Sequence, residues 1–181
     1  MTERQAYAII LIERRKELMN MKTLKMICFD MDGTIANLYG VPNWLEKLRT
    51  YDASPYLVAE PMWDMEELAF LLEVAQHRGI EVRIITWLSK ESTKEYDDMV
   101  RIAKRAWLKA YNIPFDHFHG VAYGATKADS VRKALGIDET AILFDDNAKV
   151  REGWHMGEAY DPTTCDICEM LKQILGLEDE E

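Results

Sequence analysis

Residues 28–34 read Cys-Phe-Asp-Met-Asp-Gly-Thr, and this stretch decides how the rest of the chain is interpreted. Asp30 and Asp32 follow an apolar run, residues 25–29, that predicts a short buried strand. Carboxylates at the end of a buried strand repel one another and lose hydration, so they need a compensating group from elsewhere in the chain. Gly33 follows directly and lets the backbone turn tightly at this point.

Strand patterns alternate with helix patterns along most of the chain. Strands are expected at residues 25–29, 81–86, 115–122 and 141–144, and helices at residues 64–78, 89–111 and 126–135. This alternation predicts an α/β fold, a Rossmann-like three-layer sandwich with a central parallel sheet. Right-handed crossovers bring the carboxyl ends of parallel strands to one edge of the sheet, where ligands bind.

An aromatic segment with several prolines interrupts this alternation after the first strand. It is too long for an ordinary loop, so we expect a small helical cap inserted there. The sequence therefore predicts an N-terminal helix, a core in two segments, a cap and an acidic tail, which are residues 1–22, 23–34 with 64–175, 35–63 and 176–181. In the N-terminal helix, Ile9 and Ile10 are expected to pack either on this domain or on a second copy, which would make a homodimer.

Composition excludes several classes of function. The 181 residues carry a net charge of −10, which argues against a polynucleotide partner, because gripping a polyanion needs clustered Lys and Arg. No apolar run reaches membrane-spanning length and none has the pattern of a secretory signal, so we expect a cytoplasmic protein without a membrane partner. Three cysteines, Cys28, Cys165 and Cys168, fit reduced thiols better than a disulfide framework, and a zinc site would need further ligands.

Six functional groups follow the predicted strands. They are Asp30, Asp32, Thr86, Lys127, Asp145 and Asp146. Carboxylates brought together raise one another's pKa, and a hard cation such as Mg²⁺, which prefers oxygen ligands, relieves this repulsion. Thr86 and Lys127 add hydrogen-bond donors for phosphate oxygens. The sequence therefore predicts an Mg²⁺-assisted phosphoryl-transfer site at this edge of the sheet.

Four segments resemble, in order, the signature motifs of the haloacid-dehalogenase-like phosphohydrolases. They are DMDGT at 30–34, IITW at 84–87, GATKADSV at 124–131 and ILFDD at 142–146. The resemblance covers about residues 26–154. The response-regulator receiver also combines acidic residues with a Thr and a Lys. In that fold, however, the acceptor aspartate precedes the Thr and the Lys, whereas Asp145 and Asp146 come last here.

The resemblance implies a role for each residue. Asp30 is the nucleophile that forms a phosphoaspartate, and Asp32 is first the general acid and then the general base. An aspartate at this second position is typical of the phosphatases of the superfamily, which implies hydrolysis of a small phosphate monoester. The implied ligands of Mg²⁺ are Asp30, Asp32 through its main-chain carbonyl, Asp145 and Asp146. The implied phosphate-binding residues are Gly33, Thr86, Ser89 and Lys127.

Finer features resemble the 5'(3')-deoxyribonucleotidases of this superfamily, which implies a nucleoside 5'-monophosphate as substrate. The similar segments are DMDGTIANLYG at 30–40, KRAWLKAYN at 104–112 and DDNAKVREGW at 145–154. Thr34, Asn37 and the segment TWLSKES at 86–92 depart from the pattern of that group. Aromatic residues of the cap are expected either to stack on a nucleobase or to form the core of the cap itself.

Two other functions remain open. A phosphatase of sugar phosphates or of small phosphorylated metabolites in general would share all four motifs. A non-catalytic module that binds phosphate is the second alternative, although the presence of both Asp30 and Asp32 argues against it.

Overall fold

The computed structural model describes residues 23–177. Its strands and helices are β1 (Thr23–Phe29), β2 (Ala36–Asn37), α2 (Trp44–Arg49), α3 (Ser54–Val58), β3 (Glu60–Pro61), α4 (Met65–His77), β4 (Glu81–Trp87), α5 (Lys94–Ala110), β5 (His117–Val121), β6 (Glu139–Phe144), α6 (Ala148–Glu152), β7 (Ala159–Tyr160) and α7 (Ile167–Leu175). Short 3-10 helices occupy η1 (Leu38–Gly40), η2 (Lys127–Ser130) and η3 (Arg132–Ala134). The expected N-terminal helix, its homodimer contact through Ile9 and Ile10, and residues 178–181 of the tail lie outside the described residues.

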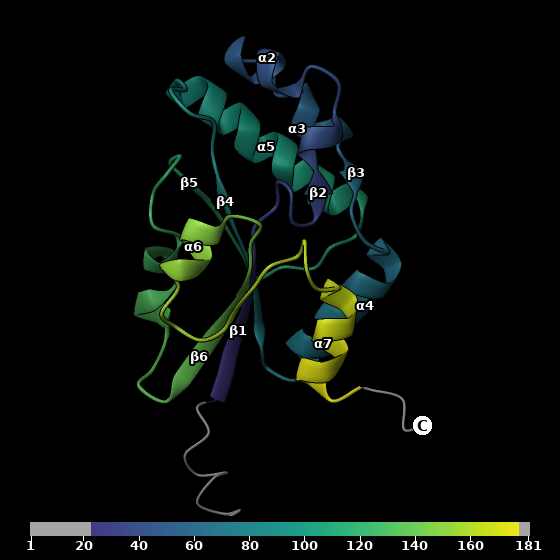
Figure 1. Ribbon diagram of the computed structural model, residues 1–181, viewed down its shortest axis with the longest axis vertical. Helices are drawn as coiled ribbons and strands as arrows, with labels where there is room; N and C mark the ends of the chain where they lie inside the picture. Colours follow the sequence, from purple (N-terminus) through teal and green to yellow (C-terminus); the bar gives the residue numbers. More distant parts are fainter. Residues whose placement is uncertain (1–22, 178–181) are drawn as a thin grey trace, which may run out of the picture.

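A central sheet of parallel strands runs through the molecule in the order β5-β4-β1-β6-β7 (Figure 1). Phe29, the last residue of β1, pairs with Ile84 on one side and with Phe144 on the other. The carboxyl ends of β1 and β6 are therefore level with each other. Helices flank the sheet, so the predicted Rossmann-like α/β fold is confirmed.

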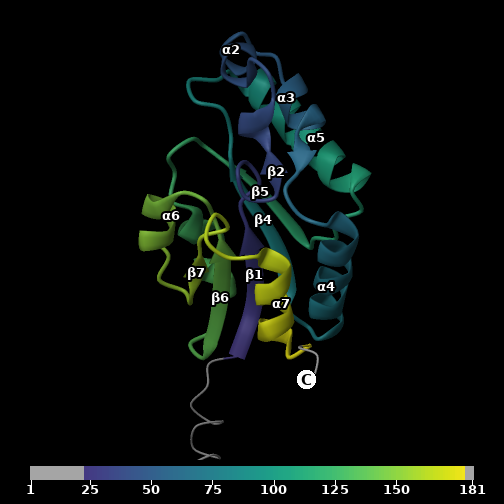
Figure 2. The ribbon, with the colours of Figure 1, turned by 45° about the vertical axis from the view of Figure 1, so that its right-hand side comes forward.

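The side chains of β1 point alternately to the two faces of the sheet. Ile27 and Phe29 belong to the core that α4 and α7 complete. Met26 and Cys28 belong to a second cluster on the opposite face, with Trp154. Figure 2 shows α4 and α7 side by side on one side of the sheet and α6 on the other. A period of two along a strand thus produces a three-layer arrangement.

The helix predicted at residues 64–78 is confirmed as α4. The Asp64 side chain accepts hydrogen bonds from the amides of Glu66 and Glu67, as an N-cap residue does. Glu67 makes an ion pair with Lys172 of α7, 2.5 Å between Oε1 and Nζ, which links the two helices that cover this face.

The segment expected to form the cap contains α2, α3 and a short antiparallel pair between β2 and β3. Its buried residue Tyr56 packs with Leu88, which follows β4, and with Tyr96 and Val100 of α5. Figures 1 and 2 both show α3 beside α5. The indole Nε1 of Trp107 in α5 also donates to the carbonyl of Ala59, at 2.7 Å. Buried contacts therefore hold this segment against α5. The division of the chain into core and cap stays a prediction.

Two of the predicted helices differ from the structure. Residues 126–135 form the 3-10 helices η2 and η3 rather than one α-helix. The buried apolar residues of this segment, Ala128 and Val131, are three apart, a spacing that 3-10 turns satisfy. The helix predicted at residues 89–111 begins only at Lys94, because Glu91 has a φ of 55° and the Thr93 side chain caps the helix. None of the helices in the described part of the chain is long and apolar enough to cross a bilayer.

The buried indole of Trp107 gives a test of how the cap segment is held. Trp107→Phe removes the donor to Ala59, leaves that carbonyl without its hydrogen bond and opens a small space. We expect the free energy of unfolding to fall by about 1–3 kcal/mol. Urea unfolding followed by circular dichroism measures it. Phe70→Leu, at an exposed position of α4, is the control and should change stability by less than about 0.5 kcal/mol. Equal effects of both variants would contradict this account.

Candidate functional site

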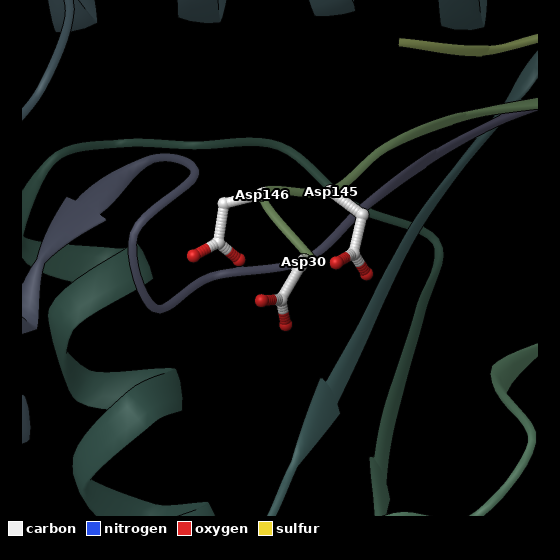
Figure 3. Close-up of side chains that lie close together, drawn as sticks. All are labelled: Asp30, Asp145 and Asp146. Carbon is white, nitrogen blue, oxygen red and sulfur yellow. The ribbon is translucent and has the colours of Figure 1, made fainter. Parts of the chain in front are cut away.

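Three carboxylates meet where β1 and β6 end. Asp30 follows β1, and its amide donates to the carbonyl of Phe144 at 2.9 Å. Asp145 and Asp146 follow β6 directly. One carboxylate oxygen from each of the three aspartates lies within 4.8 Å of the others. Figure 3 shows the three side chains close together. Asp30 and Asp145 are buried and Asp146 is partly buried. The structure therefore brings three of the predicted site residues together.

The turn after β1 is shaped by its closeness to Asp146. Gly33 has a φ of 79°, and a Cβ at this position would lie 2.6 Å from Oδ2 of Asp146. The amide of Gly33 donates to the carbonyl of Ala36 at 2.8 Å, so it serves the turn itself. Thr34, which departs from the nucleotidase pattern, accepts a hydrogen bond at Oγ1 from the amide of Asp146, at 3.2 Å. The glycine thus fits both the backbone conformation and the space.

Lys127 brings a positive charge into the acidic cluster. Its side chain is 2% exposed, and Nζ lies 2.7 Å from Oδ1 of Asp30 and 2.7 Å from Oδ2 of Asp145. Burial lowers the pKa of this lysine, but the two carboxylates outweigh burial and hold the pKa above its ordinary value. These two carboxylates therefore favour the charged form of Lys127, which the structure brings to the acidic cluster.

Asp145 is fixed from several directions. Its Oδ1 accepts from the amide of Asn147 at 2.9 Å, and its main-chain carbonyl accepts from Nη1 of Arg151 at 2.7 Å. Arg151 also pairs with Asp161. These contacts orient the carboxylate that faces Asp30 and Lys127.

The cluster carries more negative charge than its lysines neutralise. Burial, followed by the charge of Asp30, raises the pKa of Asp145 to about 6 and that of Asp146 to about 7. Asp146 has no ion pair within the described range, and the buried Oδ1 of Asp30 has no partner with hydrogen-bond geometry, although Lys127 Nζ is near. An all-oxygen set with surplus negative charge suits a hard divalent cation. The residues present therefore fit the predicted metal.

Asp32 lies in a different environment from the other aspartates. Its Oδ2 is 2.6 Å from Nζ of Lys104, whose side chain is fully buried. The same Nζ donates to Oγ1 of Thr86 at 2.7 Å. Burial raises the pKa of Asp32 despite the opposing charge of Lys104. Sequence reasoning missed Lys104. Its position between Val100 and Trp107 on the apolar stripe of α5 is the signal that would have indicated its burial.

A cavity of about 370 Å³ lies over the cluster and reaches the cap segment. Asp30, Asp32, Lys127 and both residues of the Asp145–Asp146 pair line its floor, whereas the walls include Tyr39, Trp44, Leu45, Leu48, Arg49, Tyr56, Trp87, Ser89 and Tyr123. Of the aromatic residues in the cap segment, Tyr56 is buried in a cluster that includes Tyr96 and Val100, whereas Tyr39 is half exposed and lines the cavity. Tyr123, from outside the cap segment, is also half exposed and lines the cavity.

Two other sequence predictions can be placed. Ser89 lines the cavity, and its Oγ lies 3.0 Å from the hydroxyl of Tyr56. Cys28, Cys165 and Cys168 are free thiols, the last of them buried at the start of α7. Cytoplasmic location stays a prediction.

Comparisons with known proteins bear on the fold. No protein-family model and no curated protein matches the sequence. Among solved structures, a chain of the Pnkp1/Rnl/Hen1 RNA repair complex is similar, with 17% sequence identity and a TM-score of 0.52. The match covers 77% of this chain and 42% of that one, so this chain spans less than half the length of that relative. D,D-heptose 1,7-bisphosphate phosphatase from Burkholderia thailandensis matches 83% of this chain and 98% of its own, with 12% identity and a TM-score of 0.45. The first likeness concerns the α/β fold alone.

The raised pKa values predict how the stability of the metal-free protein depends on pH. Asp145 and Asp146 have folded-state pKa values of about 6 and about 7, against about 3.9 in the unfolded chain. Between these values the folded state binds more protons than the unfolded state, so stability should fall as the pH rises from about 4 to about 7. The unfolding temperature measured in EDTA across this range tests the sign.

Asp146→Asn should flatten this pH dependence, because it removes one of the two carboxyl groups that titrate. Excess Mg²⁺ should raise the unfolding temperature of the unaltered protein at pH 8 and should raise that of Asp146→Asn less. Asp129→Asn, at a position with a 67% exposed side chain, is the control and should behave like the unaltered protein. An increase in stability toward pH 7 without metal would contradict this account of the site.

Proposed function

We propose that the protein is a metal-dependent phosphatase that hydrolyses a small phosphate monoester. The observation that carries the proposal is the meeting of Asp30 with Lys127, Asp145 and Asp146 at the floor of a cavity. Asp30 provides a buried carboxylate there, beside a cation and beside a set of oxygen ligands. This combination suits stabilisation of the charge on a transferring phosphoryl group.

Mg²⁺ is the proposed metal. Asp30, the main-chain carbonyl of Asp32, and the pair Asp145 and Asp146 would hold it. When bound, it would neutralise negative charge on the phosphoryl oxygens and the carboxylates. The choice of Mg²⁺ over other divalent cations rests on the carboxylate-rich oxygen set and on the resemblance described above.

The proposed reaction has two steps. In the first, a carboxylate oxygen of Asp30 attacks phosphorus, the bond from phosphorus to the leaving oxygen breaks, and Asp32 gives its proton to that oxygen. In the second, Asp32 takes a proton from water, the water oxygen attacks phosphorus, and the bond to Asp30 breaks to release phosphate. The upward shift of the Asp32 pKa by burial favours the protonated form that a general acid needs.

Donors for the phosphate come from several elements. Lys127 lines the cavity and is proposed to bind its oxygens, with Ser89 at the edge of the cavity as a further donor. The hydroxyl of Thr86 is a proposed donor as well, although Thr86 is buried and only the next residue, Trp87, lines the cavity. Gly33 is proposed to contribute by bringing the backbone close, since its own amide serves the turn.

The proposed substrate class is the nucleoside 5'-monophosphates. The volume of the cavity is in the range of sites for small molecules, about 300–1,000 Å³. Half-exposed Tyr39 and Tyr123 and the partly buried Trp44 offer apolar, flat surfaces for a base. Arg49 adds hydrogen-bond donors on the wall formed by α2. A sugar phosphate would leave most of this aromatic surface without a partner.

Replacement of the proposed nucleophile tests the reaction. Asp30→Asn keeps the size of the side chain and removes its nucleophilic charge, so kcat should fall by about 10⁴-fold or more. Release of inorganic phosphate with Mg²⁺ present measures it, and the circular dichroism spectrum should stay unchanged. Asp129→Asn is the matched control and should keep full activity. Near-normal activity of Asp30→Asn, or full activity in EDTA, would contradict the proposal.

A substrate panel tests the proposed substrate class. Values of kcat/KM are compared for deoxyribonucleoside and ribonucleoside 5'-monophosphates, sugar phosphates and an oligonucleotide with a terminal phosphate. Nucleotides should be preferred, and Tyr123→Ala should raise their KM about tenfold, because loss of a stacking side chain costs about 1–3 kcal/mol. KM for a sugar phosphate should not change in this variant. A flat profile or a preference for sugar phosphates would exclude the nucleotidase proposal while leaving the phosphatase proposal intact. Absence of hydrolysis across the whole panel would favour a phosphate-binding module.

A further inference from the structure

We infer that Lys104 is a positioning residue, which orients the carboxyl group of Asp32 and the hydroxyl group of Thr86 for phosphoryl transfer. The inference rests on the proposed function and adds a residue that none of the four motifs contains. Nζ of Lys104 lies 2.6 Å from Oδ2 of Asp32, 2.7 Å from Oγ1 of Thr86 and 2.9 Å from the carbonyl of Trp87. These three acceptors come from the loop after β1 and from the end of β4.

The number of donors excludes a direct contact between Lys104 and phosphate. A lysine ammonium has three N–H donors and no acceptor, and the three oxygens around it use all of them. Its side chain is also 0% exposed, and the residue does not line the cavity. Lys127, by contrast, lines the cavity and contacts Asp30. Lys104 therefore acts through its neighbours.

The contact with Thr86 fixes the direction of a hydrogen atom. Oγ1 of Thr86 accepts from Lys104, which has no acceptor to offer in return. The single hydroxyl hydrogen of Thr86 must then point away from Lys104. Thr86 is itself buried and does not line the cavity, so its contact with a phosphate oxygen is part of the proposed function. Without the ammonium, the hydroxyl would be free to turn toward the carboxylate of Asp32.

The contact with Asp32 selects one oxygen for proton exchange. Oδ2 is held by the ammonium group, which leaves Oδ1 to carry the proton to the leaving oxygen. Asp32 lines the cavity and its side chain is 16% exposed, so a substrate in the cavity can reach this carboxyl group. A carboxyl group held at one oxygen cannot rotate freely, and orientation of this kind contributes to acid catalysis.

The surroundings hold Lys104 itself in place. The flanking residues on the same face of α5, which include Val100, Ala103 and Trp107, are buried. The ring of Tyr56 lies over the ammonium, 4.7 Å from Nζ to the ring centre. A buried charge is costly unless it is paired and hydrogen-bonded, and here every donor is paired. Tyr56, from the segment expected to form the cap, therefore adds a cation–π contact to the three hydrogen bonds of the ammonium.

The test compares two substrates that differ in their need for a proton. A nucleoside 5'-monophosphate releases an alcohol, which needs protonation, whereas p-nitrophenyl phosphate releases a stable phenolate. Lys104→Met removes all three donors and keeps the length of the side chain. It should lower kcat for the nucleotide about 100-fold and should lower kcat for p-nitrophenyl phosphate at least tenfold less, because general-acid catalysis contributes about 10²–10⁴-fold. Lys109→Met, at an exposed position of α5, is the control and should change neither rate.

A double variant separates positioning from a loss of folding. In an Asp32→Asn background, the benefit that general-acid catalysis gives to the nucleotide is already lost. Adding Lys104→Met should therefore change the ratio of the two kcat values less than about threefold. This double variant removes both partners of the ion pair, so no charge is left buried alone. Equal losses for both substrates in Lys104→Met, or no loss, would overturn the inference.

A crystal structure of Lys104→Met provides a measurement that does not depend on activity. The Asp32 carboxyl group or the Thr86 hydroxyl group should adopt another rotamer, or water should replace the ammonium. Unchanged positions of both side chains, with no water in place of the ammonium, would overturn the inference even if the unaltered protein hydrolysed no phosphate monoester. Absence of hydrolysis by the unaltered protein, on the other hand, would count against the proposed function alone.

Discussion

Repulsion among carboxylates that are held close together with little water is the constraint on which this structure depends. Pairing of β1 with β6 brings Asp30 level with Asp145, so the sheet itself creates the concentration of charge. Burial and mutual repulsion raise the pKa values of Asp145 and Asp146. A fold that keeps such a cluster has to bring positive charge to the same place.

Two buried lysines meet this need in different ways. Lys127 lies between Asp30 and Asp145 and lines the cavity, so its charge is available to an incoming anion. Lys104 donates all three of its N–H groups, to Asp32, to Thr86 and to the carbonyl of Trp87. One ammonium group thus balances the charge of the floor, whereas the other fixes the orientation of the groups around it. Asp146 keeps no ion pair in the portion of the chain that the structure describes, which is why a divalent cation suits the site.

Prediction from the sequence succeeded where position along a strand was enough. Asp30, Thr86, Asp145 and Asp146 each end or follow an apolar run, and parallel strands bring such ends to one edge. It failed where the role depends on contacts across the fold. Lys104 pairs with Asp32, which lies 72 positions earlier in the sequence. The helix α5 was predicted from its apolar residues alone, so the role of a lysine on the same face was not recognised. The α-helix predicted at residues 126–135 was wrong because the segment turns more tightly, as 3-10 helices.

The contrast between residues placed by strand position and residues placed by other contacts also explains why the proposed reaction is better supported than the proposed substrate. The floor of the cavity is built from residues whose backbone is fixed by strand pairing and by the turn at Gly33. Its walls come mostly from outside the sheet, from η1, α2, α3 and loops, and Tyr39 and Tyr123 keep about half of their surface exposed. Strand geometry determines where the carboxylates lie, whatever the leaving group is. Selection among leaving groups therefore depends on side chains that the sheet does not position, and it can change while the acidic floor stays the same.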